Sequence, residues 1–282
     1  MLKFCSLYSG STGNSLFVES DNVKLLVDSG VSAKKVEDGL NSIGVNINDI
    51  DAILVTHEHL DHIQSLGTIS KKFDIPVYAN SKTWDAMPLQ KDKISSNNIN
   101  FFNNEENFEI GDFVIHPFGI PHDAANPCGF SFLCGKDKFS IATDLGHMTN
   151  NIISNLEGSS FLCLEANYDP EVLKCSKYPY ILKTRIAGPN GHLSNKLAGQ
   201  TISHLINSGL NNVVLGHLSK ENNFPELALH TVYEELSINN FSSNSIGLSV
   251  ASRTNPSEIF EINASPMSYG METISSGGKL YA

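Results

Sequence analysis

One short stretch constrains this chain more than any other: residues 51–62, Asp-Ala-Ile-Leu-Val-Thr-His-Glu-His-Leu-Asp-His. The apolar run 52–55 predicts a short buried strand. Directly after it comes a cluster of three imidazoles and one carboxylate: His57, His59, Asp61 and His62. Burying such a cluster without partners would cost several kcal/mol, and a metal removes that cost because imidazole nitrogen and carboxylate oxygen bind zinc-like ions. The spacing predicts two neighbouring ions, the first two histidines facing one and the last two residues facing the other.

Two ions need more ligands than one motif supplies, so we expect further His and Asp residues at strand ends. Three candidates stand where a predicted apolar strand runs into a turn of small residues: His122, Asp144 and His217. Loops at such positions often carry chemistry. Asp144 has two oxygens and is the natural bridge between the ions. Asp28, at another strand end, either holds an imidazole N–H or only shapes a turn.

The remaining polar groups rank lower as ligands. Four histidines are expected at the surface or satisfied in the core: His116, His147, His204 and His230. The loop 9–14, Ser-Gly-Ser-Thr-Gly-Asn, predicts a plain tight turn, with a loop whose backbone amides face an anion as the alternative. The five cysteines are scattered without a Cys-x-x-Cys pair, which favours small core residues in a reducing, cytoplasmic setting. No apolar stretch has the length of a membrane helix, and the N-terminus does not resemble a signal peptide.

The chain is acidic, with a formal charge of −11, which by itself argues against nucleic-acid binding. Residues 171–200 differ, since they carry a net charge of +4. Five cations make up this basic stretch: Lys174, Lys177, Lys183, Arg185 and Lys196. It is either a solvated helix face or a guide for an anionic substrate.

Periodicity and turn residues predict an α/β chain. We expect strands at 2–8, 15–20, 23–28, 52–55, 75–79, 107–110, 112–118, 129–134, 138–143, 161–165, 212–215, 246–250 and 258–262. We expect helices at 33–42, 63–73, 81–87 and 225–236, with helical segments around 170–186 and 194–208. The Asn-rich stretch 90–106 predicts a surface excursion, and the Ser/Gly-rich residues 263–282 a C-terminal tail. The order suggests two packed sheets with helices outside, forming one domain over residues 1–262.

The ligand motif together with His122, Asp144 and His217 resembles the dinuclear hydrolase branch of the metallo-β-lactamase fold. Further stretches resemble the YycJ/WalJ-type subfamily: 9–14, 165–169 (Glu-Ala-Asn-Tyr-Asp), 178–186, 191–195 (Gly-His-Leu-Ser-Asn) and 215–223. This likeness covers nearly the whole chain to about residue 262. One departure is Tyr168, where the subfamily leads us to expect a histidine.

The resemblance implies a four-layer αββα sandwich built of two similar halves. It implies two divalent metal ions, zinc or manganese, one held by His57, His59 and His122 and the other by Asp61, His62 and His217, with Asp144 between them. It also implies a nuclease, similar to 5′-to-3′ DNA exonucleases, with nucleic acid as substrate. Neither composition nor spacing distinguishes DNA from RNA or a monomer from a dimer.

Such a site predicts phosphodiester hydrolysis by a metal-bridging hydroxide. In this hypothesis Asp61 orients the nucleophile, and His192 donates to a phosphate or to the leaving oxygen. Lys183, Arg185, Ser194 and Lys196 would bind the substrate backbone, Ser194 at a helix start that favours an anion. The alternative within enzymes is ester, thioester or lactone hydrolysis by the same ions, with Tyr168 as a carbonyl donor. A metal-binding regulatory or redox protein is a third class, although no flavin site is evident.

Overall fold

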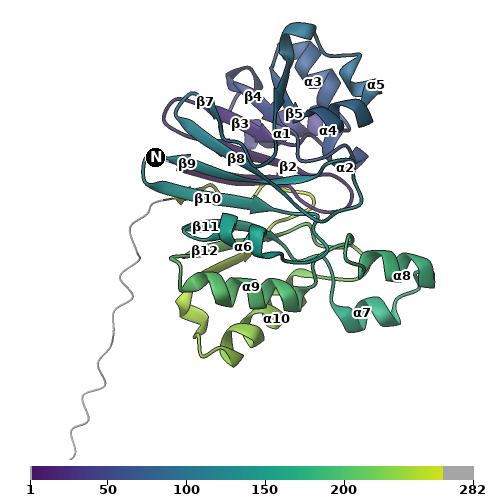
Figure 1. Cartoon of the computed structure of the whole chain (residues 1–282), viewed down its shortest axis with the longest axis vertical. Helices are drawn as coiled ribbons and strands as arrows, with labels where there is room; N and C mark the ends of the chain where they lie inside the picture. Colours follow the sequence, from purple (N-terminus) through teal and green to yellow (C-terminus); the bar gives the residue numbers. More distant parts are fainter. Residues whose placement is uncertain (1, 263–282) are drawn as a thin grey trace, which may run out of the picture.

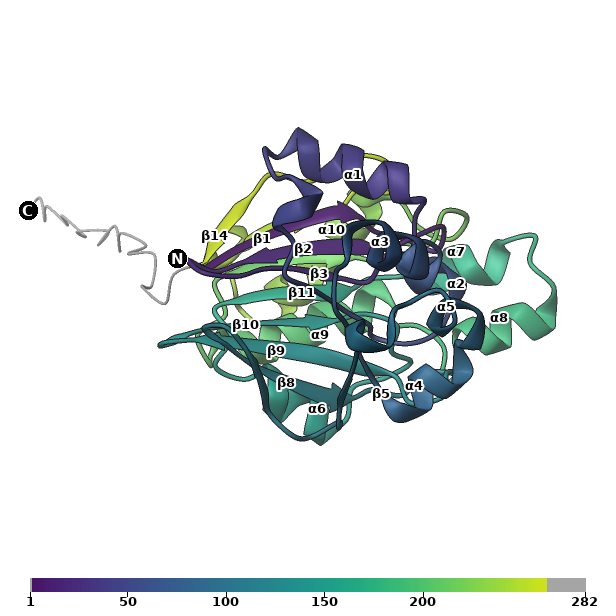
Figure 2. The same cartoon turned by 90° about the horizontal axis from the view of Figure 1, so that it is seen from above.

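The computed structural model describes residues 2–262, so the predicted tail at 263–282 lies outside the described residues. Two seven-stranded sheets pack face to face, and helices cover both outer faces (Figures 1 and 2). The predicted four-layer αββα sandwich is therefore confirmed. None of the described helices combines the length and apolarity needed to cross a membrane.

The first sheet comes from the N-terminal part of the chain plus the last described strand, in the order β14-β1-β2-β3-β4-β5-β6. Its strands are β1 (Leu2–Tyr8), β2 (Ser15–Glu19), β3 (Lys24–Val27), β4 (Ala52–Leu54), β5 (Val77–Asn80), β6 (Ile99–Phe102) and β14 (Phe260–Ile262). The run from β3 to β6 is parallel, whereas β1, β2 and β3 pair antiparallel.

The second sheet repeats this plan in the order β13-β12-β11-β10-β9-β8-β7. Its strands are β7 (Phe108–Ile110), β8 (Phe113–Gly119), β9 (Cys128–Cys134), β10 (Asp137–Ala142), β11 (Phe161–Glu165), β12 (Asn212–Gly216) and β13 (Gly247–Val250). Strands β10 to β13 are parallel, and β8 runs in their direction because β9 is antiparallel to both β8 and β10. The carboxyl ends of these strands therefore share one edge.

Helices complete the outer layers. The first sheet is covered by α1 (Ala33–Ser42), α3 (Leu66–Phe73), α4 (Ser81–Ala86) and α5 (Pro88–Lys91), with η1 (Ile47–Asp49) and η2 (Ser96–Asn98) between elements. The second sheet is covered by α6 (Asn150–Leu156), α9 (Asn195–Ile206) and α10 (Pro225–Ile238), with η3 (Ser243–Ser245) before β13. The short α2 (Leu60–Ile63) follows β4, while α7 (Pro170–Cys175) and α8 (Tyr180–Ile186) form an arm that projects from the body (Figure 2).

Both faces of the central strands are buried, which explains their unbroken apolar runs. In β4, Ala52 and Leu54 point into the core between the sheets, and Ile53 points to the core under the helices. The inter-sheet core is rich in phenylalanine, and Phe132 stacks on Phe139 with 4.6 Å between ring centroids. This packing fixes the relative position of the two sheet edges that carry the candidate ligands.

The prediction of a surface excursion at 90–106 is right in that most of these residues are exposed or half-buried, but wrong in that part of the stretch is regular structure. The stretch contains β6, which pairs with β5 and buries Phe102. Its polar residues are tied down by distant partners, since Trp84 Nε1 donates to Asn100 O and Asn98 Nδ2 donates to Asp74 Oδ1. Helix α6 was not predicted either, because its apolar face reduces to Ile152 and Leu156 within an Asn-rich segment.

Candidate metal centre

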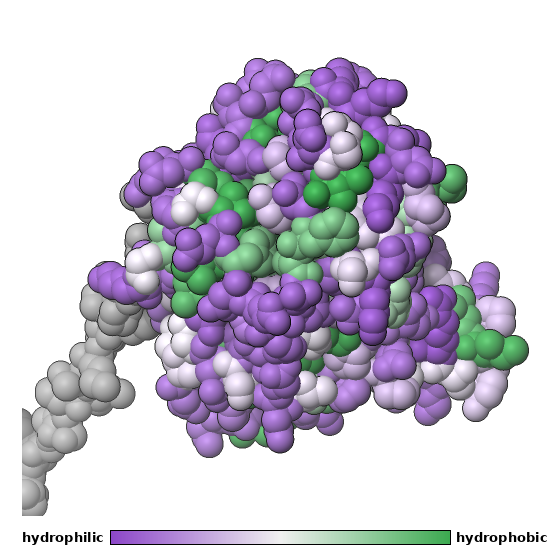
Figure 3. All heavy atoms as spheres, turned by 45° about the horizontal axis from the view of Figure 1, so that its top comes forward, coloured by the Kyte–Doolittle hydropathy of each residue, from purple (hydrophilic) through white to green (hydrophobic). Residues whose placement is uncertain are grey.

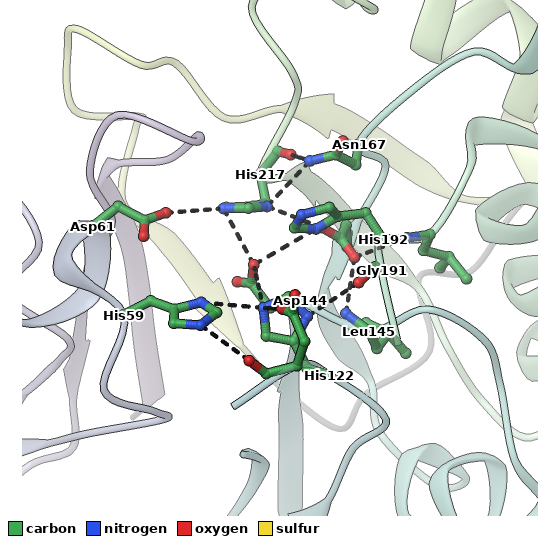
Figure 4. A network of polar contacts seen from close by, with 12 residues as sticks. His59, Asp61, His122, Asp144, Leu145, Asn167, Gly191, His192 and His217 are labelled. Atoms are coloured by element: carbon green, nitrogen blue, oxygen red, sulfur yellow. Dashed lines mark hydrogen bonds and ion pairs between the residues drawn. The ribbon is translucent and has the colours of Figure 1, made fainter. Parts of the chain in front are cut away.

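The seven predicted ligands come from four separate segments and meet where the two sheet edges face each other. His57, His59, Asp61 and His62 follow β4, His122 follows β8, and Asp144 and His217 follow β10 and β12. Figure 4 shows side chains from these loops pointing toward one another.

Three residues that follow strands at the centre use the left-handed backbone region, which non-glycine residues rarely adopt. The φ angles are 64° at Asp28, 59° at Asp144 and 54° at His217. The surrounding structure holds them there: Asp28 N donates to Leu54 O at 2.8 Å, and His217 N donates to Ser9 Oγ at 2.8 Å. Such strain costs on the order of 1–3 kcal/mol per residue and concentrates at functional sites.

The first group of ligand atoms comes from His57, His59 and His122. His57 Nδ1 lies 3.0 Å from Thr56 Oγ1, which leaves Nε2 buried without a hydrogen-bond partner. His122 Nδ1 donates to Gly191 O at 3.1 Å, and His59 Nε2 donates to Asp123 O at 3.2 Å. The remaining ring nitrogens, His122 Nε2 and His59 Nδ1, lie 3.3 Å apart. Three lone pairs thus converge, as a cation requires.

The second group is Asp61, His62 and His217. Asp61 Oδ2 lies 3.6 Å from both His62 Nε2 and His217 Nε2. The Nδ1 atoms of both histidines are held from outside, at 2.8 Å from Asp28 Oδ2 and 2.9 Å from Glu165 Oε1. Their Nε2 atoms are therefore the ring nitrogens that face Asp61 and could bind an ion.

Asp144 lies between the two groups. Its Oδ2 is 3.2 Å from His62 Nε2, and its Oδ1 is 3.4 Å from His217 Nε2 and 3.8 Å from His122 Nε2. Asp144 Oδ2 and His217 Nε2 are buried without hydrogen-bond partners. In each of the five imidazoles the protein holds one ring nitrogen, and the other faces the centre. This arrangement, together with the unpaired atoms, fits a pair of divalent ions.

The electrostatics also favour cations. Burial opposes protonation of His62, but the charges of Asp144 and Asp28 outweigh it and hold the His62 pKa well above its ordinary value. Burial likewise opposes charge on His217, yet Asp144, Asp61 and Glu165 raise its pKa to about 10. Carboxylates that draw protons this strongly also attract metal ions, which would replace those protons on the ring nitrogens.

Asp28 takes the supporting place expected of it. One oxygen binds His62 Nδ1, and both oxygens accept from Thr56, Oδ1 from the backbone N–H at 2.9 Å and Oδ2 from the hydroxyl at 2.8 Å. The hydroxyl of Thr56 in turn lies 3.0 Å from His57 Nδ1. A single carboxylate thereby orients one histidine of each ligand group.

Sequence reasoning missed Glu165, a fully buried carboxylate on the far side of the centre. Its Oε1 accepts from His217 Nδ1 at 2.9 Å and from His192 Nδ1 at 2.8 Å. Its Oε2 accepts from the backbone N–H groups of Leu145 and Leu193 at 3.0 and 2.9 Å. The signal that could have identified Glu165 is its position at a strand end. It is the last residue of β11, which lies in the sheet between the strands that precede Asp144 and His217.

The loop 9–14 is more than the plain turn that its sequence predicts. Asn14 N donates to Asp61 O at 2.8 Å, and Asn14 Nδ2 lies 3.1 Å from His62 Nε2. Ser9 Oγ receives the backbone N–H of His217. The loop therefore positions ligands from both sheets.

A cleft of about 170 Å³ opens beside the centre. It is lined by His192, Gly191, Asn167, Ser219, Ser11, Asp123, Arg185, Leu182, Ile186 and Tyr178. Arg185 Nε donates to Asp123 Oδ2 at 2.6 Å, so part of the predicted basic stretch is neutralised. Lys183 and Tyr168 do not line this cleft but a second cavity, which lies between α7 and α8.

The other predicted substrate-binding residues begin α9. Ser194 caps this helix, because its hydroxyl accepts from Leu197 N at 3.3 Å. Lys196 Nζ lies 4.0 Å from Glu235 Oε1. Each of the four low-ranked histidines contacts groups outside the ligand set: His116 contacts Asn107 and Glu105, His147 contacts Pro189, His204 contacts Glu157, and His230 contacts Glu234.

Comparison with known proteins places this geometry in a family. The model of the metallo-beta-lactamase superfamily matches residues 8–217, from the end of β1 to the last predicted ligand. The chain belongs to the metallo-beta-lactamase superfamily. Its metal-ligand cluster and fold agree with that membership.

The relatives narrow the assignment to the YycJ/WalJ-like subfamily, as the sequence motifs predict. The chain is 39% identical over 235 residues to Exodeoxyribonuclease YycJ of Bacillus anthracis, covering 83% of this chain and 89% of the relative. It is 39% identical over 236 residues to Exodeoxyribonuclease WalJ of Streptococcus pneumoniae serotype 2, covering 83% and 88%. The protein is therefore a metal-dependent hydrolase of this group.

Solved structures support the fold. The metallo-beta-lactamase fold protein YhfI from Bacillus subtilis aligns with a TM-score of 0.65 at 16% identity, over 92% of this chain and all of that one. Zn(2+)-bound PqqB from Methylobacterium extorquens aligns with a TM-score of 0.65 at 16% identity, over 91% and 99%. At this identity the likeness concerns the fold alone.

Proposed function

We propose that this protein is a phosphodiesterase that acts on DNA, in the manner of a 5′-to-3′ exonuclease, through two divalent metal ions. The observation that carries the proposal is the similarity to proteins named exodeoxyribonucleases over 83% of the chain. The convergence of all seven ligand side chains in the structure supports it.

The residues present fit two ions, one held by His57, His59 and His122 and the other by Asp61, His62 and His217, with Asp144 shared. Divalent ions bound there would polarise a phosphoryl oxygen and lower the pKa of water toward neutrality. The nitrogen and oxygen ligand set suits zinc and manganese alike.

The protein's own residues would orient water and move protons. The Asp61 side chain is 28% exposed whereas that of Asp144 is 3% exposed, so Asp61 is the carboxylate that can orient an attacking water. His192 lines the cleft, and its Nδ1–H is held by Glu165 at 2.8 Å. This hydrogen bond leaves Nε2 to donate a proton to the leaving oxygen.

The basic stretch would guide the substrate backbone. Arg185 lies in the cleft wall and Lys183 on the opposite side of α8. Ser194 and Lys196 stand at the start of α9, where the positive end of the helix dipole favours an anion. Local positive charge would offset the acidic character of the whole chain.

The test is digestion of end-labelled DNA and RNA beside a panel of lactones and thioesters, with zinc or manganese added. We expect DNA cleavage by the wild type, strong loss in Asp61→Ala and no loss in Asp85→Ala, which removes a carboxylate exposed on α4. Ester turnover with intact DNA would instead identify the small-molecule hydrolase. The support that Tyr168 lent to that alternative is weak, since its ring lines the cavity between α7 and α8.

A further inference from the structure

A pocket of about 460 Å³ opens beside the loops that carry the metal centre, apart from the cleft. Its wall combines three cations and three hydroxyl groups and contains no carboxylate. It is lined by Thr12, Lys35, Leu218, Lys220, Pro225, Val250, Ala251, Ser252, Arg253 and Thr254. In a chain with a formal charge of −11, a wall of this composition favours an anionic ligand.

The two lysines of the pocket are available to a ligand. Neither ammonium group has an ion-pair partner among the described residues, and both residues are exposed. Lys35 Nζ lies 5.8 Å from the centroid of the Tyr8 ring, a contact that leaves its charge unneutralised. Lys34, the preceding residue of α1, differs because its Nζ lies 3.5 Å from Asp38 Oδ2.

The third cation, Arg253, is half-buried and is held by neutral groups. Its Nε and Nη2 donate to Leu218 O at 3.2 and 3.1 Å, and Nη2 also donates to Ser219 O at 2.6 Å. Burial lowers the pKa of the Arg253 guanidinium, and the charge of Glu221 opposes this effect only in part. A partly desolvated cation without an ion-pair partner is stabilised by a bound anion.

Two loops separate the pocket from the cleft beside the metal centre. In the first loop Ser11 lines the cleft, and the next residue, Thr12, lines the pocket. In the second loop Ser219 lines the cleft, whereas its neighbours Leu218 and Lys220 line the pocket. This second loop directly follows the last metal ligand. A polyanion bound in the cleft could therefore reach the pocket with an adjacent part of its backbone.

We propose that this pocket binds a phosphate group of the DNA backbone other than the one that is cleaved. The inference rests on the proposed function and adds a contact region outside the cleft. Cations and hydroxyl donors recognise a phosphate without reading the base sequence. Glu221 and Glu226 follow two of the lining residues in the chain but lie outside the lining itself, so the phosphate would face Lys35, Lys220 and Arg253.

The experiment measures binding of the metal-loaded protein to a short duplex DNA whose phosphorothioate linkages resist cleavage. Fluorescence anisotropy gives the affinity over a series of salt concentrations. We expect Lys35→Gln and Lys220→Gln each to reduce the slope of log affinity against log salt by about 1, and the double variant by about 2. Arg253 stays unchanged, because its guanidinium also holds the loop after the last metal ligand.

The matched control is the double variant Lys34→Gln/Lys136→Gln, which removes the same net charge outside the pocket. Lys34 is the neighbour of Lys35 on α1, and Lys136 lies in the turn between β9 and β10. The control should keep the wild-type slope. Equal slopes for the wild type and the Lys35→Gln/Lys220→Gln variant would overturn the proposal. An equal reduction in the pocket and control variants would also overturn it, since only the net charge would then matter.

A free phosphate compound is the other source of the same chemistry. Titration calorimetry with inorganic phosphate and with thymidine monophosphate tests it. Binding of either compound that is lost in the Lys35→Gln/Lys220→Gln variant, together with an unchanged slope for DNA, would assign the pocket to a small ligand and refute the DNA contact.

Cleavage of ordinary duplex DNA keeps the two proposals separate. Cleavage by the wild type combined with unchanged slopes in the pocket variants would refute only the phosphate pocket. A reduced slope in those variants without cleavage under any metal would refute only the nuclease.

Discussion

Replacing Glu165 by glutamine tests the assembly of the centre most directly. The carboxylate accepts four hydrogen bonds, from two imidazoles and two backbone N–H groups. Glutamine has one acceptor oxygen in nearly the same volume, so two of the four donors lose their acceptor. A buried donor without a partner costs about 1–3 kcal/mol. We therefore expect the free energy of unfolding to fall by about 2–6 kcal/mol.

The same substitution should weaken metal binding. His217 Nδ1 would lose the partner that fixes its ring orientation, and loss of such an outer partner typically costs about 10–100-fold in metal affinity. The assays are competition with a chromophoric chelator, and urea unfolding at fixed metal concentration.

A surface pair of the same chemistry provides the control. Glu234 Oε1 lies 3.2 Å from His230 Nε2, and both side chains are more than half exposed. Glu234→Gln should change neither stability nor metal affinity, because exposed pairs contribute little. If Glu165→Gln kept wild-type metal affinity and stability, the assigned role of Glu165 in holding the ligands would be refuted.

Three further outcomes are expected. Removing the metal ions with a chelator should lower the free energy of unfolding by about 4 kcal/mol, relative to protein at a metal concentration 1,000 times Kd. If the urea unfolding curves with chelator and with metal coincided, a metal site would be contradicted. Lys183→Ala should reduce the slope of log affinity for DNA against log salt by about 1, whereas Lys136→Ala, in the turn before β10, should leave it unchanged; equal slopes would dismiss Lys183 as a phosphate contact. Phe139→Ala should lower the free energy of unfolding by about 3–5 kcal/mol, because it leaves a cavity against Phe132. The control Leu89→Ala, at an exposed residue, should leave stability unchanged. If Phe139→Ala lowered the free energy of unfolding by less than about 1 kcal/mol, the core between the sheets would not be tightly packed.

Much of the centre was visible in the sequence because its parts are local signals. A buried strand followed by His57, His59, Asp61 and His62 predicts a metal site from a local pattern alone. His122, Asp144 and His217 each end a strand whose apolar run is evident. Parallel strands then bring their carboxyl ends to one edge, so strand-end position already implies proximity.

Other features depended on partners far away in the chain. Strand β6 forms in an Asn-rich segment because β5 and Trp84 supply its hydrogen bonds. The sequence predicts Arg185 as a cation available to substrate, but in the fold its Nε lies 2.6 Å from Asp123 Oδ2. Glu165 can orient ligands only in the folded chain, because Oε1 accepts hydrogen bonds from His192, 27 residues later, and His217, 52 residues later.

The amino-acid sequence by itself determined which nitrogen and oxygen donors are available for a metal and the strand ends that carry them, since residue type and strand pattern are properties of short segments. Only the tertiary structure decided which groups orient those ligands, which charges are neutralised and where a basic pocket opens beside the cleft. The physical reason is that hydrogen bonds, ion pairs and cavities arise from distances between residues remote in sequence, and those distances exist only after the two sheets have packed.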